Sequence, residues 1–156
     1  MCIKEKELSC GGLIYSTNNE ILITRSTNNK YWNIPKGIIE KDETPLQCAI
    51  REIKEETNID VSSCLCIDIG EHEYLSYKNL HLFIFVLHHI PVDIKCNSIF
   101  LTKKGISLPE ISDFKWCRVD EAKLLWSPNF MNTINSVIKY VKDSKLYYTY
   151  SILNGD

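Results

Sequence analysis

The segment from Gly37 to Ile59 reads GIIEKDETPLQCAIREIKEETNI, and it decides how the rest of the chain is interpreted. Thr44, Pro45 and Gln47 fit a capping box, in which threonine caps a helix, proline takes the first helical position and glutamine reaches back. Asn58 stands where a left-handed residue closes a helix, and asparagine is the usual second choice to glycine there. The segment therefore predicts a helix of about thirteen residues.

Three glutamates share one face of this helix. At about 100° per residue, Glu56 lies roughly 40° from Glu52 on one side, and Glu55 lies roughly 60° from it on the other. An apolar stripe suited to packing on a sheet lies about a quarter-turn away and consists of Leu46, Ala49, Ile50 and Ile53.

The acidic face predicts a metal site. Glu52 and Glu56 are like charges at four-residue spacing, which costs a few tenths of a kcal/mol unless a cation offsets it. Hard carboxylate oxygens suit Mg²⁺ or Mn²⁺ better than zinc, which favours His and Cys ligands. These residues indicate a metal-assisted attack of water on a phosphate chain. A solvated acidic helix face is the alternative interpretation.

The longer pattern resembles the Nudix box of the Nudix hydrolases. Gly37 is followed after five residues by Glu43 and after seven more by REIKEETNI, with Asn58 in place of the final glycine. The preceding WNIPK, Trp32 to Lys36, is similar to the segment before the box in many members. The resemblance implies the α/β fold class, an α/β/α sandwich with a mixed β-sheet and a loop-helix-loop metal site. It also implies hydrolysis of a nucleoside diphosphate linked to another moiety.

The resemblance also implies a set of metal ligands. Carried across position by position, Glu52, Glu55 and Glu56 would hold one or more Mg²⁺ or Mn²⁺ ions, and the backbone carbonyl of Gly37 would be a further ligand. Asn58 lies at the helix end rather than among these ligands, so we expect it to adopt the same left-handed turn at a small cost.

The catalytic residues implied by the resemblance are Glu52, Arg51, Glu43 and Glu110. Glu52 matches the position often credited with activating water, although that base lies outside the box in parts of the family. Arg51 would orient a carboxylate, and Glu43 would brace the loop. Glu110, six residues before Trp116, resembles an acidic position that supplies a base or an extra ligand in some members.

Three residues outside the helix are candidate substrate contacts, and each has a structural alternative. Arg25 ends a predicted strand and could reach a phosphate or lie in solvent. Trp32 could stack on a base or plug the edge of the sheet. Lys36, beside the metal loop, is the better candidate for a phosphate contact.

The remaining chain predicts strands and further helices around this core. The expected strands are Leu8–Ser16, Glu20–Arg25, Val61–Gly70, Leu80–Ile90 and Asp113–Arg118. Asp120 is expected to cap a short helix, and Ser127 with Pro128 to start another. The connection from Pro91 to Pro109 is long enough to carry function, with Lys103 and Lys104 near phosphates as one possibility. The tyrosine-rich tail KLYYTYSILNGD could dock as a strand, stack on a ligand or form a dimer contact.

Composition limits the function classes. A chain of 156 residues, 44% hydrophobic with a formal net charge of −2, predicts a single domain over 1–156 and argues against DNA binding. The seven cysteines show no CxxC pair, so they predict reduced thiols. There is no apolar run of signal-peptide or membrane-span length, so we expect a cytoplasmic protein without a membrane partner, as a monomer or homodimer.

The sequence thus predicts a Mg²⁺-dependent pyrophosphohydrolase of small-molecule nucleotides. The approach Trp-x-x-Pro-Lys-Gly favours dinucleoside polyphosphates such as diadenosine tetraphosphate, or RNA 5′ ends, because members acting on these often carry it. ADP-ribose, nucleotide sugars and nucleoside triphosphates remain alternatives. A domain that senses nucleotides without hydrolysing them is a hypothesis of another class, and it is less favoured because such domains usually lose box carboxylates.

Overall fold

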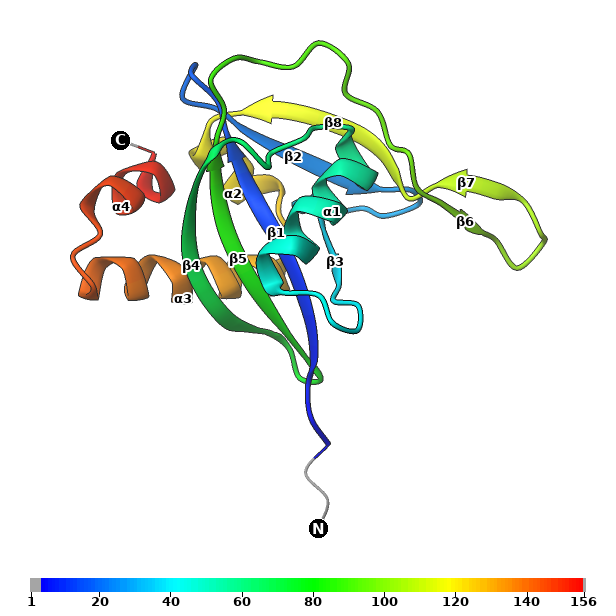
Figure 1. The fold of residues 1–156 in the computed structure, drawn as a ribbon, viewed down its shortest axis with the longest axis horizontal. Helices are drawn as coiled ribbons and strands as arrows, with labels where there is room; N and C mark the ends of the chain where they lie inside the picture. The colour runs from blue at the N-terminus through cyan, green and yellow to red at the C-terminus, as the bar shows by residue number, and fades with distance from the viewer. Residues whose placement is uncertain (1–3, 156) are drawn as a thin grey trace.

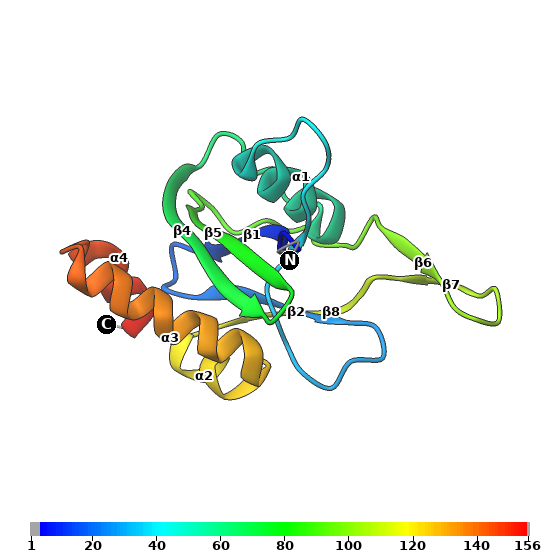
Figure 2. The ribbon, with the colours of Figure 1, turned by 90° about the horizontal axis from the view of Figure 1, so that it is seen from below.

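The computed structural model describes residues 4–155, in which a mixed sheet carries helices on both faces (Figures 1 and 2). Strands follow one another in the order β4 (Leu65–Leu75), β5 (Lys78–Val86), β1 (Glu7–Tyr15), β2 (Ile21–Ser26) and β8 (Ile111–Cys117), and β3 (Lys36–Ile38) pairs with β1. The β1–β5 pairing is parallel and the others are antiparallel. This is the predicted mixed sheet.

The helices divide between the two faces. Figure 2 shows α1 (Pro45–Thr57) on one side of the sheet and α2 (Val119–Leu125), α3 (Pro128–Asp143) and α4 (Tyr147–Asn154) on the other. Each face has its own buried apolar cluster, one beneath α1 and a larger one beneath α2, α3 and α4. The predicted α/β/α sandwich is therefore confirmed.

Helix α1 has the predicted ends. The Thr44 side chain accepts a hydrogen bond from the Gln47 backbone N–H at 3.2 Å, and the Gln47 side chain accepts one from the Thr44 backbone N–H at 2.9 Å. Asn58 closes the helix with φ 66° and ψ 8°, in the left-handed region. The local rules of capping thus suffice to position this helix.

The buried face of α1 is wider than the predicted apolar stripe. Ala49 and Ile53 of the stripe are fully buried, whereas Leu46 is 38% exposed. Glu52 and Glu56 are buried as well, so part of the glutamate face also packs toward the sheet. The reason lies in β3, whose backbone contacts both glutamates, as the site geometry below shows.

Two strands have different bounds from those predicted. Val61 does not begin β4, because residues 61–64 form a turn in which the Cys64 N–H donates to the Val61 carbonyl at 3.1 Å. Val61 is nevertheless buried, which explains why an apolar pattern was misleading there. Strand β5 ends at Val86, and it lies inside the sheet between β4 and β1.

The long connection 91–109, for which the sequence predicted no strand, has secondary structure of its own. It contains β6 (Ile99–Leu101) and β7 (Ser107–Pro109), an antiparallel hairpin that projects from the body of the molecule (Figures 1 and 2). Its base adjoins β8, so the hairpin begins and ends next to Glu110.

The C-terminal helices correct the predicted cap of α2 and decide the secondary structure of the tyrosine-rich tail. Asp120 is not the cap, because α2 begins at the buried Val119 with Arg118 as its N-cap, two residues before the predicted cap. Ser127 does cap α3, accepting from the Phe130 N–H at 3.2 Å. The tyrosine-rich tail forms α4 instead of a strand and packs on α3. None of the helices formed by residues 4–155 has the length and apolarity that a membrane crossing requires.

Candidate active site

Strand β3 brings backbone and carboxylates together. Gly37 pairs with Cys10 of β1, which places the β3 backbone under α1. A Cβ atom at Gly37 would lie 2.0 Å from the carboxyl carbon of Glu52 and 2.2 to 2.3 Å from its two oxygens. Only glycine leaves room for this carboxylate to rest against the backbone.

Glu56 is the more deeply buried of the two inner carboxylates. It is 6% exposed, and its Oε2 accepts a hydrogen bond from the Lys36 backbone N–H at 3.0 Å. Burial, together with the negative charges of Glu52 and Glu110, raises the pKa of Glu56 to about 8 against the opposing effect of Lys36. This carboxylate therefore lies where a cation would be strongly stabilising.

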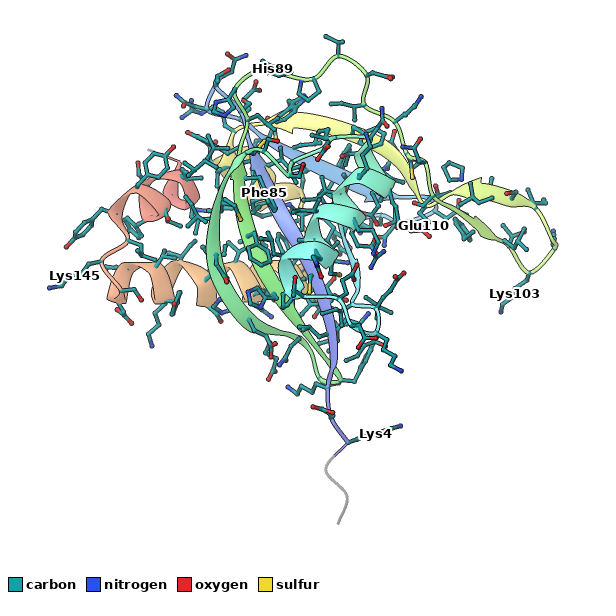
Figure 3. All side chains as sticks on the ribbon, viewed as in Figure 1. Lys4, Phe85, His89, Lys103, Glu110 and Lys145 are labelled. Atoms are coloured by element: carbon teal, nitrogen blue, oxygen red, sulfur yellow. The ribbon has the colours of Figure 1, made fainter. Side chains whose placement is uncertain are left out.

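Glu52 is buried like Glu56, but it also accepts a hydrogen bond from a charged side chain, Arg51. It is 9% exposed, and its burial raises its pKa, as do the charges of Glu55 and Glu110. The hydrogen bond from Arg51 lowers it. The charge of Glu110 acts on both buried glutamates, although Glu110 is distant from α1 in sequence and directly follows the β6–β7 hairpin. Figure 3 shows it between that hairpin and α1. The structure thus brings the carboxylate predicted outside the box close to those within it.

Arg51 organises the outer side of the site. Its Nε and Nη2 donate to the two oxygens of Glu43 at 2.7 and 2.9 Å, and Nη1 donates to Glu52 Oε1 at 2.7 Å. Nη1 also reaches Glu55 at 3.3 Å, and Nη2 donates to the Ile38 carbonyl at 3.2 Å. The guanidinium hydrogen bonds from Arg51 lower the pKa of Glu43 to about 2. Arg51 therefore ties the loop before α1 to the helix.

The residues present fit a hard divalent cation. The candidate donors are carboxylate oxygens and a glycine carbonyl, which suit Mg²⁺ or Mn²⁺. Two of these carboxylates are buried with raised pKa values, and among residues 4–155 Glu52 forms its ion pair with Arg51. Among residues 4–155 no three His, Cys, Asp or Glu side chains are already arranged as a metal-binding group. Glu55 accounts for part of this, because it faces Arg51, with 44% of its side chain exposed.

The predicted substrate contacts Arg25 and Trp32 lie next to each other, and each also contacts other residues of the protein. Arg25 Nε donates to Asp113 at 3.0 Å, and its guanidinium lies 5.5 Å from the centre of the Trp32 ring. Trp32 is half-buried against the larger apolar cluster, and its backbone N–H donates to the Leu125 carbonyl at 3.1 Å. Arg25 is thus paired with Asp113 instead of lying free in solvent, and the contacts of Trp32 favour its structural alternative, packing against the sheet.

Lys36 has a partner that sequence reasoning missed. Its Nζ lies 5.2 Å from the centre of the Tyr74 ring, and the Tyr74 hydroxyl accepts from Asn33 Nδ2 at 3.1 Å. Tyr74 comes from β4, so no local pattern joins it to Lys36.

The model of the NUDIX domain family matches residues 6–135 of this chain. The chain belongs to the Nudix family. It is therefore a Nudix hydrolase, an enzyme that acts on pyrophosphate bonds and binds nucleotide substrates.

Known Nudix relatives and structures agree with this assignment. The chain is 33% identical over 78 residues to an 8-oxo-dGTP diphosphatase of Proteus vulgaris, covering 47% of this chain and 70% of that protein. It is 35% identical over 85 residues to the mRNA decapping complex subunit 2 of Schizosaccharomyces pombe, covering 54% of this chain but only 10% of that protein. Its fold is similar to that of the dihydroneopterin triphosphate pyrophosphohydrolase of E. coli, with a TM-score of 0.64 and 22% identity over 90% of this chain and 99% of that one.

Proposed function

We propose that this Nudix hydrolase uses Mg²⁺, or Mn²⁺, to hydrolyse dinucleoside polyphosphates such as diadenosine tetraphosphate, or the pyrophosphate linkage at RNA 5′ ends. The observation that carries the metal dependence is the pair of buried carboxylates, Glu52 and Glu56, with Glu110 as a third negative charge beside them. Gly37, Glu52, Glu55 and Glu56 would hold the cation. When bound, it would neutralise charge on the phosphates and lower the pKa of an attacking water.

The chain's own residues would divide the remaining work. Glu52 or Glu110 would accept the proton of the attacking water, since both are carboxylates near the metal site. Arg51 keeps Glu52 oriented through the 2.7 Å hydrogen bond. Lys36 would hold the phosphate chain, with Arg25 and Trp32 as further contacts, because a cation over an aromatic ring at the mouth of the site favours a polyanion.

The choice of substrate rests on two supports. The first is the Trp32-to-Gly37 approach, WNIPKG, which is similar to that of members acting on such substrates. The second is the relative from Schizosaccharomyces pombe, whose name describes mRNA decapping. The relative from Proteus vulgaris favours a second candidate, a nucleoside triphosphate diphosphatase. ADP-ribose and nucleotide sugars are further alternatives, and ADP-ribose represents them in the test.

The test is product release with Mg²⁺ across diadenosine tetraphosphate, triphosphorylated RNA, 8-oxo-dGTP and ADP-ribose. Glu56→Gln is the inactive control, because glutamine keeps an oxygen to accept the Lys36 N–H but removes the charge. Glu121→Gln in α2, which loses an exposed ion pair with Lys115, should leave turnover unchanged. Preferred turnover of 8-oxo-dGTP or ADP-ribose would replace the substrate proposal. A nucleotide that stabilises the protein without any turnover in Mg²⁺ or Mn²⁺ would favour a sensing role.

A further inference from the structure

Asn58 makes contacts that a glycine at the end of the box cannot make. Its Nδ2 donates to the Asp93 carbonyl at 3.1 Å, and its Oδ1 accepts from Asn97 Nδ2 at 3.1 Å. The residue holds φ 66°, where glycine is normally favoured. A longer bond runs from Nδ2 to Asp93 Oδ2 at 3.4 Å. The left-handed turn requires none of these side-chain bonds, so capping alone does not explain the asparagine.

These bonds fasten residues 93–98, here called the strap, to the end of α1. Within the strap, the Lys95 N–H donates to the Thr57 carbonyl at 3.2 Å and the Asn97 N–H donates to the Glu55 carbonyl at 2.7 Å. Both acceptors are carbonyls of the last helical turn, which lack partners inside the helix. The strap thus completes the end of the helix that carries the glutamates.

The strap leads directly to Glu110. The Glu110 N–H donates to the Ser98 carbonyl at 3.0 Å, and the Ile111 N–H donates to Cys96 Sγ at 3.4 Å. On its other side, the Glu110 carbonyl accepts from the Thr27 N–H at 2.9 Å. The backbone of Glu110 is therefore held between the strap and the end of β2, although the β6–β7 hairpin separates it from the strap in sequence.

We infer that Asn58 is a positioning residue for Glu110. Through the strap it fixes the distance between the Glu110 backbone and the helix that bears Glu52 and Glu56. The inference rests on the proposed function, because it matters for turnover only if Glu110 takes part in the metal site or in proton transfer. It also explains why this box ends in asparagine, since the side-chain hydrogen bonds to Asp93 and Asn97 offset the cost of placing a residue other than glycine in the left-handed region.

The experiment compares wild type with Asn58→Gly, which introduces the residue that suits the left-handed position but removes the side-chain bonds to Asp93 and Asn97. We expect kcat on the best substrate to fall about tenfold while KM changes less than about twofold, because Lys36 and Arg25 are untouched. Amide hydrogen exchange of Lys95, Asn97 and Glu110 should become about tenfold faster. Asn19→Gly is the matched control, since Asn19 has φ 58° in the β1–β2 turn; it should change neither measurement.

A double-mutant cycle with Glu110→Gln identifies the route of the effect. If Asn58 acts through Glu110, Asn58→Gly should cause no further loss of kcat in the Glu110→Gln background. An equal loss in both backgrounds, or unchanged exchange at Glu110, overturns the inference. If the wild type turns over no member of the substrate panel, the proposed function fails, and the exchange of Glu110 still decides whether Asn58 holds it.

Discussion

Arg51 binds Glu43 through both oxygens of its carboxylate, at 2.7 and 2.9 Å, while a third guanidinium nitrogen binds Glu52 at 2.7 Å. Lysine cannot make this forked contact, because its ammonium is a point donor on a flexible stem. Arg51→Lys should therefore lower the free energy of unfolding by about 2 kcal/mol, measured by urea denaturation. Arg118→Lys is the control, since 61% of the Arg118 side chain is exposed; a loss as large there would contradict this explanation.

The same ion pair predicts an acid-dependent loss of stability. The hydrogen bonds from Arg51 lower the pKa of folded Glu43 from 4.5 to about 2. A lowered pKa means that the ionised pair stabilises the fold above pH 4.5, and that this contribution of about 3 kcal/mol disappears as pH falls from 4.5 to 2. Glu43→Gln should be less stable than wild type at neutral pH, and the difference should narrow across that window. A difference that stays constant with pH would exclude this pair as its source.

Gly37 should tolerate no side chain while Glu52 is present. A Cβ there would lie 2.0 Å from the Glu52 carboxyl carbon, so Gly37→Ala must displace either the carboxylate or β3. We expect a loss of about 2 kcal/mol or more in the free energy of unfolding. In a Glu52→Ala background the same substitution should cost much less, because the clashing atoms are gone. Additive losses in the double variant would show that another contact is responsible.

Lys36 should contribute to binding more than to the chemical step. Lys36→Met keeps the stem over Tyr74 but removes the charge. KM for a polyphosphate substrate should rise about tenfold, with kcat changed less than about threefold, and the salt dependence of KM should weaken. Lys30→Met is a matched control, because Lys30 lies over the Tyr31 ring at a similar 5.3 Å. An equal effect of both variants would indicate a general surface charge effect.

Sequence reasoning succeeded where the information is local. Thr44, Gln47 and Asn58 define the ends of α1 through backbone hydrogen bonds within a few residues, so capping rules predict them. The same reasoning failed at Asp120, because the burial of the preceding Val119 moved the start of α2. The apolar pattern correctly placed Ala49 and Ile53 on the buried face of α1, but it did not predict the burial of Glu52 and Glu56, which depends on contact with the β3 backbone.

The surroundings of the candidate site depend on contacts that no local pattern encodes. Arg25 meets Asp113 only because β2 and β8 pair in that register, and Lys36 meets Tyr74 only because β3 and β4 belong to the same sheet, β3 paired with β1 and β4 with β5. Glu110 approaches Glu52 and Glu56 through the docking of the strap on α1. The resemblance identified the residues, but their mutual charge, burial and hydrogen bonding became visible only in the fold.

The pairing of β1 and β2 with distant strands has a consequence for synthesis on the ribosome. Helix α1 can close as soon as Asn58 has emerged, whereas Tyr15 meets Val86 much later and Ile21 meets Cys117 later still. A nascent chain that stops before Cys117 therefore carries a complete glutamate helix beside an open strand edge. Protease protection of β2 in stalled nascent chains should appear only after β8 has left the exit tunnel. The order in which strands leave the ribosome therefore determines when the complete sheet of this enzyme can form.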